Sequence, residues 1–235
     1  MNNGSRKYHH IFFDLDMTLW DFESNAREAY EDIYRTFRLS DRGIDSLNDF
    51  ISKYFVHNDR LWEQYRNGEI EKELLRTLRF ELTLRDYGID DPALAQAIGH
   101  EYVTISPTKT RLFPNAHTTL AYLQKQYTLS IITNGFEEVQ FRKLKNSHLD
   151  SYFNHVITSE QAGSKKPDPE IFKYALQQVG AEASQSVMIG DDLEVDILGA
   201  MQAGMDAVFF NPKRTEHKSN ILHEINDLND LTNIL

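Results

Sequence analysis

Five short runs of apolar residues along the chain have the length of buried β-strands. Most of the segments between them carry apolar residues at helical spacing, bounded by residues that start or stop helices. One such helix opens at Pro169 and stops at Gly180. A second has Pro114 in its first turn, and a third is stopped by Gly204. This alternation predicts an α/β fold, a doubly wound, Rossmann-like parallel sheet of five strands. The expected strands cover residues 10–13, 128–132, 155–157, 187–189 and 207–210. Residues 220–235 are expected to form either a closing strand, loop and short helix or a terminal helix.

The connection between the first two strands is longer than a crossover requires. A βαβ unit needs about 30 residues, whereas the chain runs from Leu15 to Tyr127 before the second strand begins. The clearest helix within this stretch follows Ser46, a residue suited to capping a helix, and ends at Asn67. Its aromatic stripe is interpreted mainly as the core of a small helical bundle. Further helices are expected at 26–37, 74–84 and 93–105. The prediction is an α/β core of residues 1–19 and 108–235 with a helical cap domain, 20–107, inserted into it.

The charge balance narrows the choice of partners. The 235 residues include 25 basic and 36 acidic side chains, which gives a net charge of −11. This balance argues against a nucleic-acid polymer or an anionic membrane as partner, whereas small charged molecules remain possible. The chain has no cysteine, its first apolar run is too short for a signal peptide, and no segment approaches the roughly 18 apolar residues of a membrane span. We therefore expect a cytoplasmic protein; the sequence predicts no oligomeric state.

Polar residues gather directly after three of the expected strands, and Lys166, in the loop after another strand, would join them. In an open parallel sheet the carboxyl ends of the strands form one edge, and ligands bind there, where the strand order reverses. An Asp-rich loop without chemistry is the alternative for the first group taken alone. The residues are Asp14 and Asp16 after the first strand, Thr133 and Asn134 after the second, Lys166 after the third, and Asp191, Asp192 and Asp196 after the fourth.

These residue types suit phosphoryl transfer. Asp14 is a carboxylate nucleophile that could form an aspartyl-phosphate, and Asp16 could protonate the leaving alkoxide and then deprotonate the attacking water. Thr133 and the adjacent Asn134, close to a helix start, could hold the phosphoryl oxygens. Lys166 would screen the nucleophile from the phosphate as the two approach.

A hard-cation site is also expected, because Mg²⁺ is usually held by one or two carboxylates together with phosphate. Asp191 can complete such a site beside Asp14. The predicted substrate is a small phosphomonoester.

The four groups of polar residues together resemble the motifs of the haloacid dehalogenase superfamily, most of whose members are phosphatases with an aspartate nucleophile. The resemblance implies that Mg²⁺ is bound by the Asp14 carboxylate, the Asp16 backbone carbonyl and the Asp191 side chain. It further implies that Asp196 supports Lys166 or a metal-bound water, and Asp16 points to phosphate chemistry and away from dehalogenation. The matching segments are 14–18, 133–135, 166–169 and 190–196.

Three segments resemble the pyrimidine 5′-nucleotidases within that superfamily: 12–22, 61–70 and 132–136. This resemblance implies hydrolysis of dUMP, dTMP, UMP and related nucleotides. Trp20, Phe22, Trp62 and Phe136 are aromatic residues that could stack on a base, although packing in the protein core explains them equally well. The alternatives are a sugar-phosphate phosphatase, a phosphomutase, or a binding or regulatory protein that keeps the fold without turnover.

Overall fold

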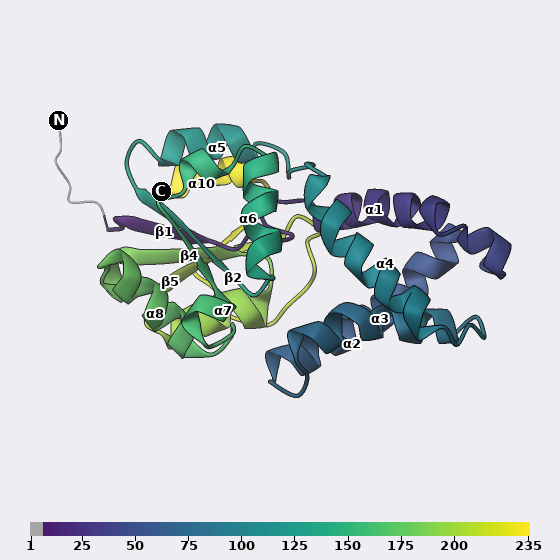
Figure 1. The fold of residues 1–235 in the computed structure, drawn as a ribbon. Coiled ribbons are helices and arrows are strands. Elements are labelled where there is room, and N and C mark those ends of the chain that lie inside the picture. The colour runs from purple at the N-terminus through teal and green to yellow at the C-terminus, as the bar shows by residue number, and fades with distance from the viewer. Residues whose placement is uncertain (1–6) are drawn as a thin grey trace. The chain divides into compact units, whose positions relative to one another are not determined.

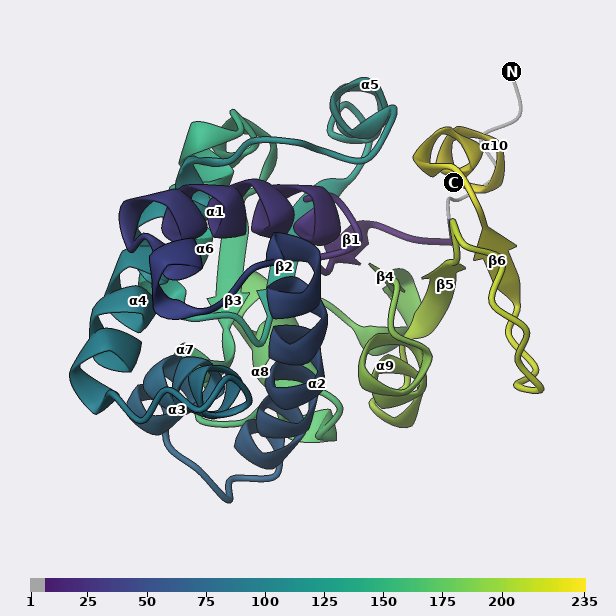
Figure 2. The same ribbon diagram turned by 90° about the vertical axis from the view of Figure 1, so that its right-hand side faces the viewer.

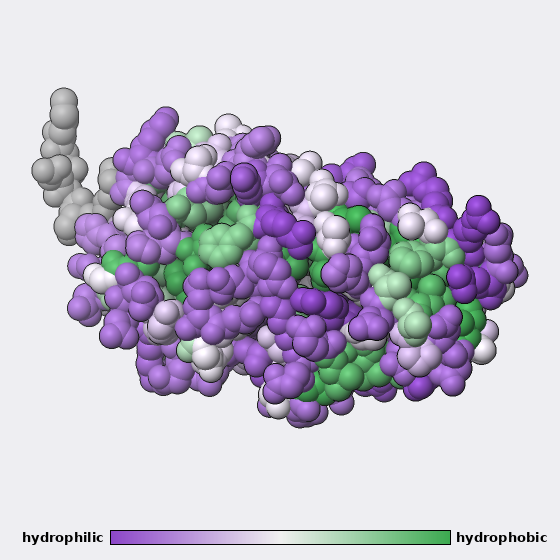
Figure 3. Space-filling view, viewed as in Figure 1, coloured by the Kyte–Doolittle hydropathy of each residue, from purple (hydrophilic) through white to green (hydrophobic). Residues whose placement is uncertain are grey.

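The computed structural model describes residues 7–235, and the chain divides into two compact units. The first consists of Met1–Phe22 and Arg111–Leu235, and the second of Glu23–Thr110. No described helix is long and apolar enough to cross a membrane. On the face seen in Figure 3 the surface is mainly hydrophilic, with apolar residues confined to separate patches.

The first unit is built on a parallel sheet of six strands, in the order β3-β2-β1-β4-β5-β6 (Figures 1 and 2). The predicted α/β class is confirmed, and all five expected strands form. The sixth strand, β6, lies in a segment for which the sequence left a short strand or a terminal helix open. The strands are β1 His10–Phe13, β2 Thr128–Thr133, β3 His155–Thr158, β4 Ser186–Gly190, β5 Asp206–Phe210 and β6 His223–Ile225.

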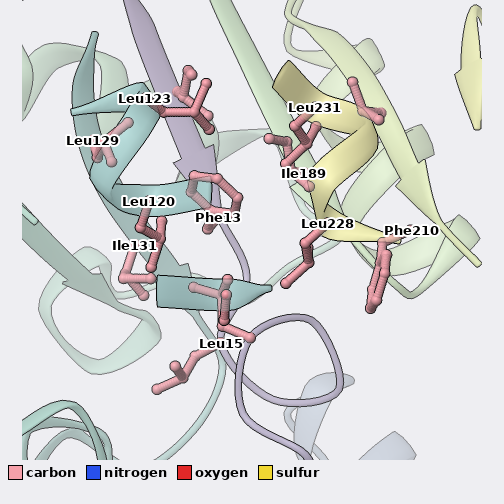
Figure 4. Close-up of a cluster of buried hydrophobic side chains, with 14 of the residues drawn as sticks. Phe13, Leu15, Leu120, Leu123, Leu129, Ile131, Ile189, Phe210, Leu228 and Leu231 are labelled. Carbon is pink, nitrogen blue, oxygen red and sulfur yellow. The ribbon is translucent and has the colours of Figure 1, made fainter. Parts of the chain in front are cut away.

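Alternate residues of the central strands pack on opposite faces of the sheet, because successive side chains of a strand point to opposite sides. Ile11 and Phe13 belong to a cluster on one face that includes side chains of α5 (Ala116–Leu123) and α10 (Leu231–Ile234). Figure 4 shows part of this cluster. Phe12 belongs to a cluster on the other face with residues of α8 (Pro169–Val179). Burial on both faces explains why these strands read as unbroken apolar runs.

Three helices of the first unit position polar residues at the strand ends. They are α6 (Glu137–Asn146) after β2, α7 (Ser159–Ala162) after β3, and a π-helix, Leu193–Leu198, after β4. The third helix predicted for 193–203 is therefore divided, since the π-helix is followed by a separate α9 (Gly199–Gln202). Isolated π-helical turns occur frequently at functional sites.

The expected boundaries of two other helices can be compared with the structure. The helix α8 begins at Pro169 and ends at Gly180, which has a left-handed φ of 65°, as predicted. The expected start at Pro114 is wrong, because α5 begins at Ala116. The chain first turns through Asn115, whose φ of 65° is not helical, so Pro114 lies outside the helix.

The second unit contains four α-helices: α1 Phe22–Thr36, which starts at the end of the first unit, α2 Leu47–Arg66, α3 Lys72–Arg85 and α4 Pro92–Ile105. The Ser46 side chain accepts a hydrogen bond from the backbone N–H of Asp49 at 3.2 Å, so it caps α2 as predicted. An aromatic cluster fills the interior, in which Tyr30 stacks on Tyr102 at 5.2 Å and lies 4.7 Å from Tyr54. That this unit acts as a cap during turnover stays a prediction.

Candidate active site

The candidate site lies where the strand order reverses. β1 is flanked by β2 on one side and by β4 on the other, and Phe13 is in register with both Ile131 and Ile189. The residues that follow these strands therefore emerge at one edge of the sheet. Asp14 continues this alignment, since its backbone N–H donates to the carbonyl of Ile189 at 2.9 Å.

Lys166 joins two buried carboxylates. Its Nζ donates to Asp14 Oδ1 at 2.5 Å and to Asp196 Oδ1 at 2.6 Å. All three residues are buried, with residue exposures of 2%, 7% and 2% for Lys166, Asp14 and Asp196. Burial disfavours the charge of Lys166, but the two carboxylates outweigh that effect and raise its pKa. The lysine is therefore charged at neutral pH, and the two acids hold it beside the expected nucleophile.

Gly190 makes room for Asp196. A Cβ atom at position 190 would lie 2.3 Å from Oδ2 and 2.5 Å from Cβ of Asp196. No side chain larger than hydrogen fits there unless Asp196 moves. The glycine at the end of β4 thus allows the acid of the following π-helix to approach the strand and reach Lys166.

Asp191 lies next to this ion pair and forms no salt bridge of its own with any residue in the described range 7–235. It accepts a hydrogen bond from Thr18 Oγ1 at 3.1 Å. Burial raises the pKa of Asp191 to about 9, and the charges of Asp14 and Asp196 add to the increase. Burial likewise raises the pKa of Asp14 to about 7, although Lys166 opposes the shift. Full ionisation of the carboxyl groups would therefore leave an excess of negative charge at this end of the cluster, and the raised pKa values oppose it.

The donor set fits a hard divalent cation. Carboxylate oxygens of Asp14, Asp191 and Asp196 lie within 4.8 Å of one another. Oxygen ligands in this number suit Mg²⁺, which is bound by few carboxylates and keeps several waters. Lys166 carries one positive charge for the two carboxylates that it contacts, so ionisation of all three acids would require further positive charge at this cluster.

Asp16 is oriented by two donors from α6. Its Oδ1 accepts a hydrogen bond from Lys143 Nζ at 2.5 Å, and its Oδ2 accepts one from Gln140 Nε2 at 2.9 Å. The Asp16 side chain is partly accessible, with 28% exposure, whereas Lys143 is buried. Sequence reasoning placed Asp16 in the site but missed both of its partners.

The signal for these partners was present in the pattern of α6. Gln140 and Lys143 are three positions apart and share the buried face of this helix with Val139 and Leu144. A lysine on the apolar face of a helix is unusual unless a carboxylate pairs with it. The sequence could therefore have indicated an acidic partner, but not which acid it was.

Thr133 ends β2 with its hydroxyl oxygen acting as an acceptor. Oγ1 accepts hydrogen bonds from the backbone N–H of Gly135 at 3.1 Å and from Gln140 Nε2 at 2.7 Å. These two bonds occupy the oxygen's lone pairs and leave the hydroxyl proton to be donated. This arrangement suits a residue that donates to a phosphoryl oxygen.

Asn134 is fixed by the backbone of Lys166. Its Nδ2 donates to the Lys166 carbonyl, and its Oδ1 accepts from the Lys166 N–H, both at 2.9 Å. The amide side chain therefore clamps the loop that carries the lysine. A contact of Asn134 with substrate phosphate stays a prediction. The structure thus brings together all seven expected residues: Asp14, Asp16, Thr133, Asn134, Lys166, Asp191 and Asp196.

Asp192, beside this group, has a structural contact of its own. Its Oδ1 accepts hydrogen bonds from the backbone N–H groups of Glu194 and Val195, both at 3.0 Å. The side chain therefore caps the π-helix that carries Asp196.

The family model of the haloacid dehalogenase-like hydrolases matches residues 8–204 of the chain. The pyrimidine 5′-nucleotidase PynA of Streptococcus pneumoniae is 30% identical, with 97% of this chain and 95% of that protein covered. The glyceraldehyde 3-phosphate phosphatase of Methanothermobacter thermautotrophicus is also 30% identical, with 96% and 98% covered. Relatives of equal similarity thus carry the names of two different substrate classes.

Among solved structures, that of YfnB from Bacillus subtilis superposes on the chain with a TM-score of 0.88 and 28% identity. The match covers 97% of this chain and 99% of that one. The structure of YfnB was solved bound to magnesium and is described as revealing interdomain movement.

Proposed function

The chain belongs to the haloacid dehalogenase-like hydrolases and is a phosphatase of that family, and from this premise we propose that it hydrolyses phosphomonoesters through an aspartyl-phosphate on Asp14 with Mg²⁺ as cofactor. The observation that carries the proposal is the buried Asp14 carboxylate, which lies 2.5 Å from the Lys166 ammonium and within 4.8 Å of Asp191 oxygens. Asp16 follows two residues later, with its carboxylate partly accessible.

In the first step an Asp14 carboxylate oxygen attacks phosphorus. The bond between phosphorus and the ester oxygen breaks, and a protonated Asp16 gives its proton to the departing alkoxide. Thr133 donates its hydroxyl proton to a phosphoryl oxygen. The ammonium of Lys166 offsets the repulsion between the carboxylate and the phosphate dianion.

In the second step water attacks the phosphorus of the aspartyl-phosphate. Asp16, now ionised, takes a proton from this water, and the bond between phosphorus and Asp14 breaks. The products are inorganic phosphate and the regenerated carboxylate. Both steps therefore use one carboxyl group for proton transfer, first as acid and then as base.

The residues that would hold Mg²⁺ are Asp14 and Asp191, with the backbone carbonyl of Asp16 as the further ligand that family resemblance implies. When bound, the ion supplies positive charge that stabilises the phosphoryl oxygens and keeps the Asp14 carboxylate ionised. Asp196 accepts a second hydrogen bond from Lys166 Nζ and so helps to hold the ammonium in place.

Pyrimidine nucleoside 5′-monophosphates are the proposed substrates. The support is the similarity to PynA and the resemblance of segments 12–22, 61–70 and 132–136 to that group. In this proposal the helical unit Glu23–Thr110 selects small substrates. The glyceraldehyde 3-phosphate phosphatase relative makes a sugar phosphate the second candidate.

The test is phosphate release from a panel of phosphomonoesters, each measured with MgCl₂ and with EDTA. The panel contains dUMP, dTMP, UMP, purine nucleotides, sugar phosphates and p-nitrophenyl phosphate. We expect Mg²⁺-dependent release that is highest on the pyrimidine nucleotides. Highest release on sugar phosphates would leave the mechanism in place and replace the substrate assignment.

The nucleophile is tested by Asp14→Asn, with Asp150→Asn as the control because Asp150 is an exposed acid. Release should fall to background in the first variant and stay unchanged in the second, while both variants keep the wild-type circular dichroism spectrum. Persistent turnover in Asp14→Asn would rule out the aspartyl-phosphate. Conversion of a sugar phosphate to an isomer without free phosphate would identify a phosphomutase, and no turnover on any ester would favour a binding protein.

A further inference from the structure

Lys143 is a buried cation whose ion pair is with the expected acid–base residue. Its Nζ lies 2.5 Å from Asp16 Oδ1, and its side chain is 5% exposed. The ammonium also lies 4.1 Å from the centroid of the Trp20 ring, which is fully buried. Burying a lysine is costly unless its charge is paired. The contacts with Asp16 and Trp20 therefore hold the ammonium in one place.

Gln140 connects the same carboxylate to the residue expected to hold the phosphate. Its Nε2 donates to Asp16 Oδ2 at 2.9 Å and to Thr133 Oγ1 at 2.7 Å. An amide nitrogen carries two protons, so both bonds can exist together. A single side chain thus fixes the separation between Asp16 and Thr133.

The loop after β2 is shaped to admit Gln140. A Cβ atom on Gly135 would lie 2.4 Å from Cδ and 2.5 Å from Nε2 of Gln140. Any larger residue at position 135 would displace the amide from Asp16 and Thr133. The close packing of Gly135 on Gln140 is an observation independent of the hydrogen bonds, and it points to the same arrangement.

We propose that Lys143 and Gln140 are positioning residues, which hold the two carboxylate oxygens of Asp16 in the orientation that proton transfer to the leaving group requires. This inference rests on the proposed function, in which Asp16 is the acid and base. An aspartate side chain that is free to rotate would present its carboxylate to the ester oxygen only part of the time. Small errors in placing a catalytic group lower the rate strongly, so fixing both oxygens raises turnover without adding a contact to the substrate.

The proposal is tested with Lys143→Met, Asp16→Asn and the double variant. Methionine keeps the length of the apolar stem and removes the ammonium. The control is Lys145→Met, since Lys145 lies on the same helix but is exposed. The two esters are p-nitrophenyl phosphate, whose leaving group needs little protonation, and the best alkyl phosphomonoester of the panel above. Circular dichroism and thermal melting check the fold of each variant.

We expect Lys143→Met to lower kcat on the alkyl ester by about 10- to 100-fold, part of the effect that a general acid contributes. KM should stay within about threefold, and the loss on p-nitrophenyl phosphate should be smaller, because proton transfer matters less there. In the Asp16→Asn background the same substitution should change kcat by less than about twofold, since residues that act through one another are not additive. Lys145→Met should leave kcat unchanged on both esters.

Three outcomes would overturn the inference: a loss in Lys143→Met no greater than in Lys145→Met, equal losses on the two esters, or the full loss in the Asp16→Asn background. If Asp16→Asn itself turns over the alkyl ester normally, the assignment of Asp16 in the proposed function fails, and the inference fails with it. Gln140→Met provides a second variant should Lys143→Met not fold. Gln140→Met removes the amide donor, so the loss of kcat should again be larger on the alkyl ester than on p-nitrophenyl phosphate. Equal losses on the two esters in this variant would also refute the proposal.

Discussion

Replacing Lys166 by methionine would test whether the buried ion pairs hold the site together. The substitution preserves most of the side-chain volume. It removes the ammonium group that forms salt bridges with Asp14 and Asp196. Both carboxylates stay buried, and each loses a hydrogen bond, of 2.5 Å to Asp14 and 2.6 Å to Asp196. Removing one partner of a buried ion pair costs about 3–5 kcal/mol because a charge is left uncompensated. We expect a loss of this size in the free energy of unfolding at pH 8 in EDTA.

The loss should depend on pH, with a sign that follows from the carboxyl groups. Burial raises the pKa of Asp14 and of Asp196, while Lys166 holds both below what burial alone would set. Removing Lys166 therefore raises both pKa values further. A group whose pKa is higher in the folded state stabilises the fold below its unfolded pKa and loses that contribution as the pH rises through its folded pKa.

In the wild type, the stabilising contribution of protonated Asp14 is lost as the pH rises through about 7, its pKa in the folded state. In Lys166→Met it continues to higher pH, so the difference between the two proteins grows between pH 5 and pH 8. At pH 5 the buried carboxyls of the variant can be protonated at little cost. At pH 5 the variant should be less stable than the wild type by under about 2 kcal/mol, since a change of one pKa unit corresponds to about 1.4 kcal/mol.

The assay is urea unfolding at pH 5 and pH 8, followed by tryptophan fluorescence. The chain has two tryptophans, so a Trp62→Phe background leaves Trp20, which is buried in the same unit as Lys166, as the only reporter. Lys165→Met, one residue away, is the control and should keep the wild-type midpoint. A deficit that is equal at the two pH values, or below about 1 kcal/mol at pH 8, would refute the ion-pair account.

Three further predictions follow from the geometry. Mg²⁺ should raise the melting temperature of the wild type at pH 8, corresponding to about 2.7 kcal/mol at 100 times its dissociation constant, and Asp191→Asn should lose most of this increase in the same thermal scan. Gly190→Ala should lower stability by about 1–3 kcal/mol in urea, because its Cβ would lie 2.3 Å from Asp196 Oδ2; an unchanged midpoint would mean that Asp196 moves freely. Thr133→Val should lower kcat by about 100-fold, as loss of one preorganised donor does, whereas Thr133→Ser should retain most activity in a phosphate-release assay.

The fold was predictable where burial acts on both faces of an element. Residues 11–13 of β1 and 187–189 of β4 are all apolar because both faces of the sheet are buried, so composition alone indicated these strands. The strand β6 is different, since only Ile225 of its three residues is buried. Its conformation depends on pairing with β5, a long-range contact that no local pattern records.

The site was predictable to the extent that it follows from topology. Asp14, Thr133 and Asp191 each follow a strand, and parallel strands deliver such residues to one edge. The approach of α6 to that edge depends on tertiary packing, which explains why Lys143 and Gln140 were missed. The side chain of Asn134 was equally beyond prediction, because its partner is the backbone of Lys166, 32 residues further along the chain.

The acidic residues of the site would repel a phosphomonoester, because both carry negative charge. Asp14 and Asp196 are buried and Asp191 is partly buried, and all three lie close to a single ammonium, that of Lys166. Burial, together with the charge of neighbouring carboxylates, raises the pKa of each of the three acids. In that state a proton on Asp191 supplies the missing positive charge near neutral pH. A divalent cation held by Asp14 and Asp191, as the proposed function has it, would supply positive charge in place of this proton and would favour the ionised form of Asp14. In the proposed function, the same cluster that would repel the substrate by itself would accept it with a metal bound, and the net charge of −11 over the whole chain would not oppose this.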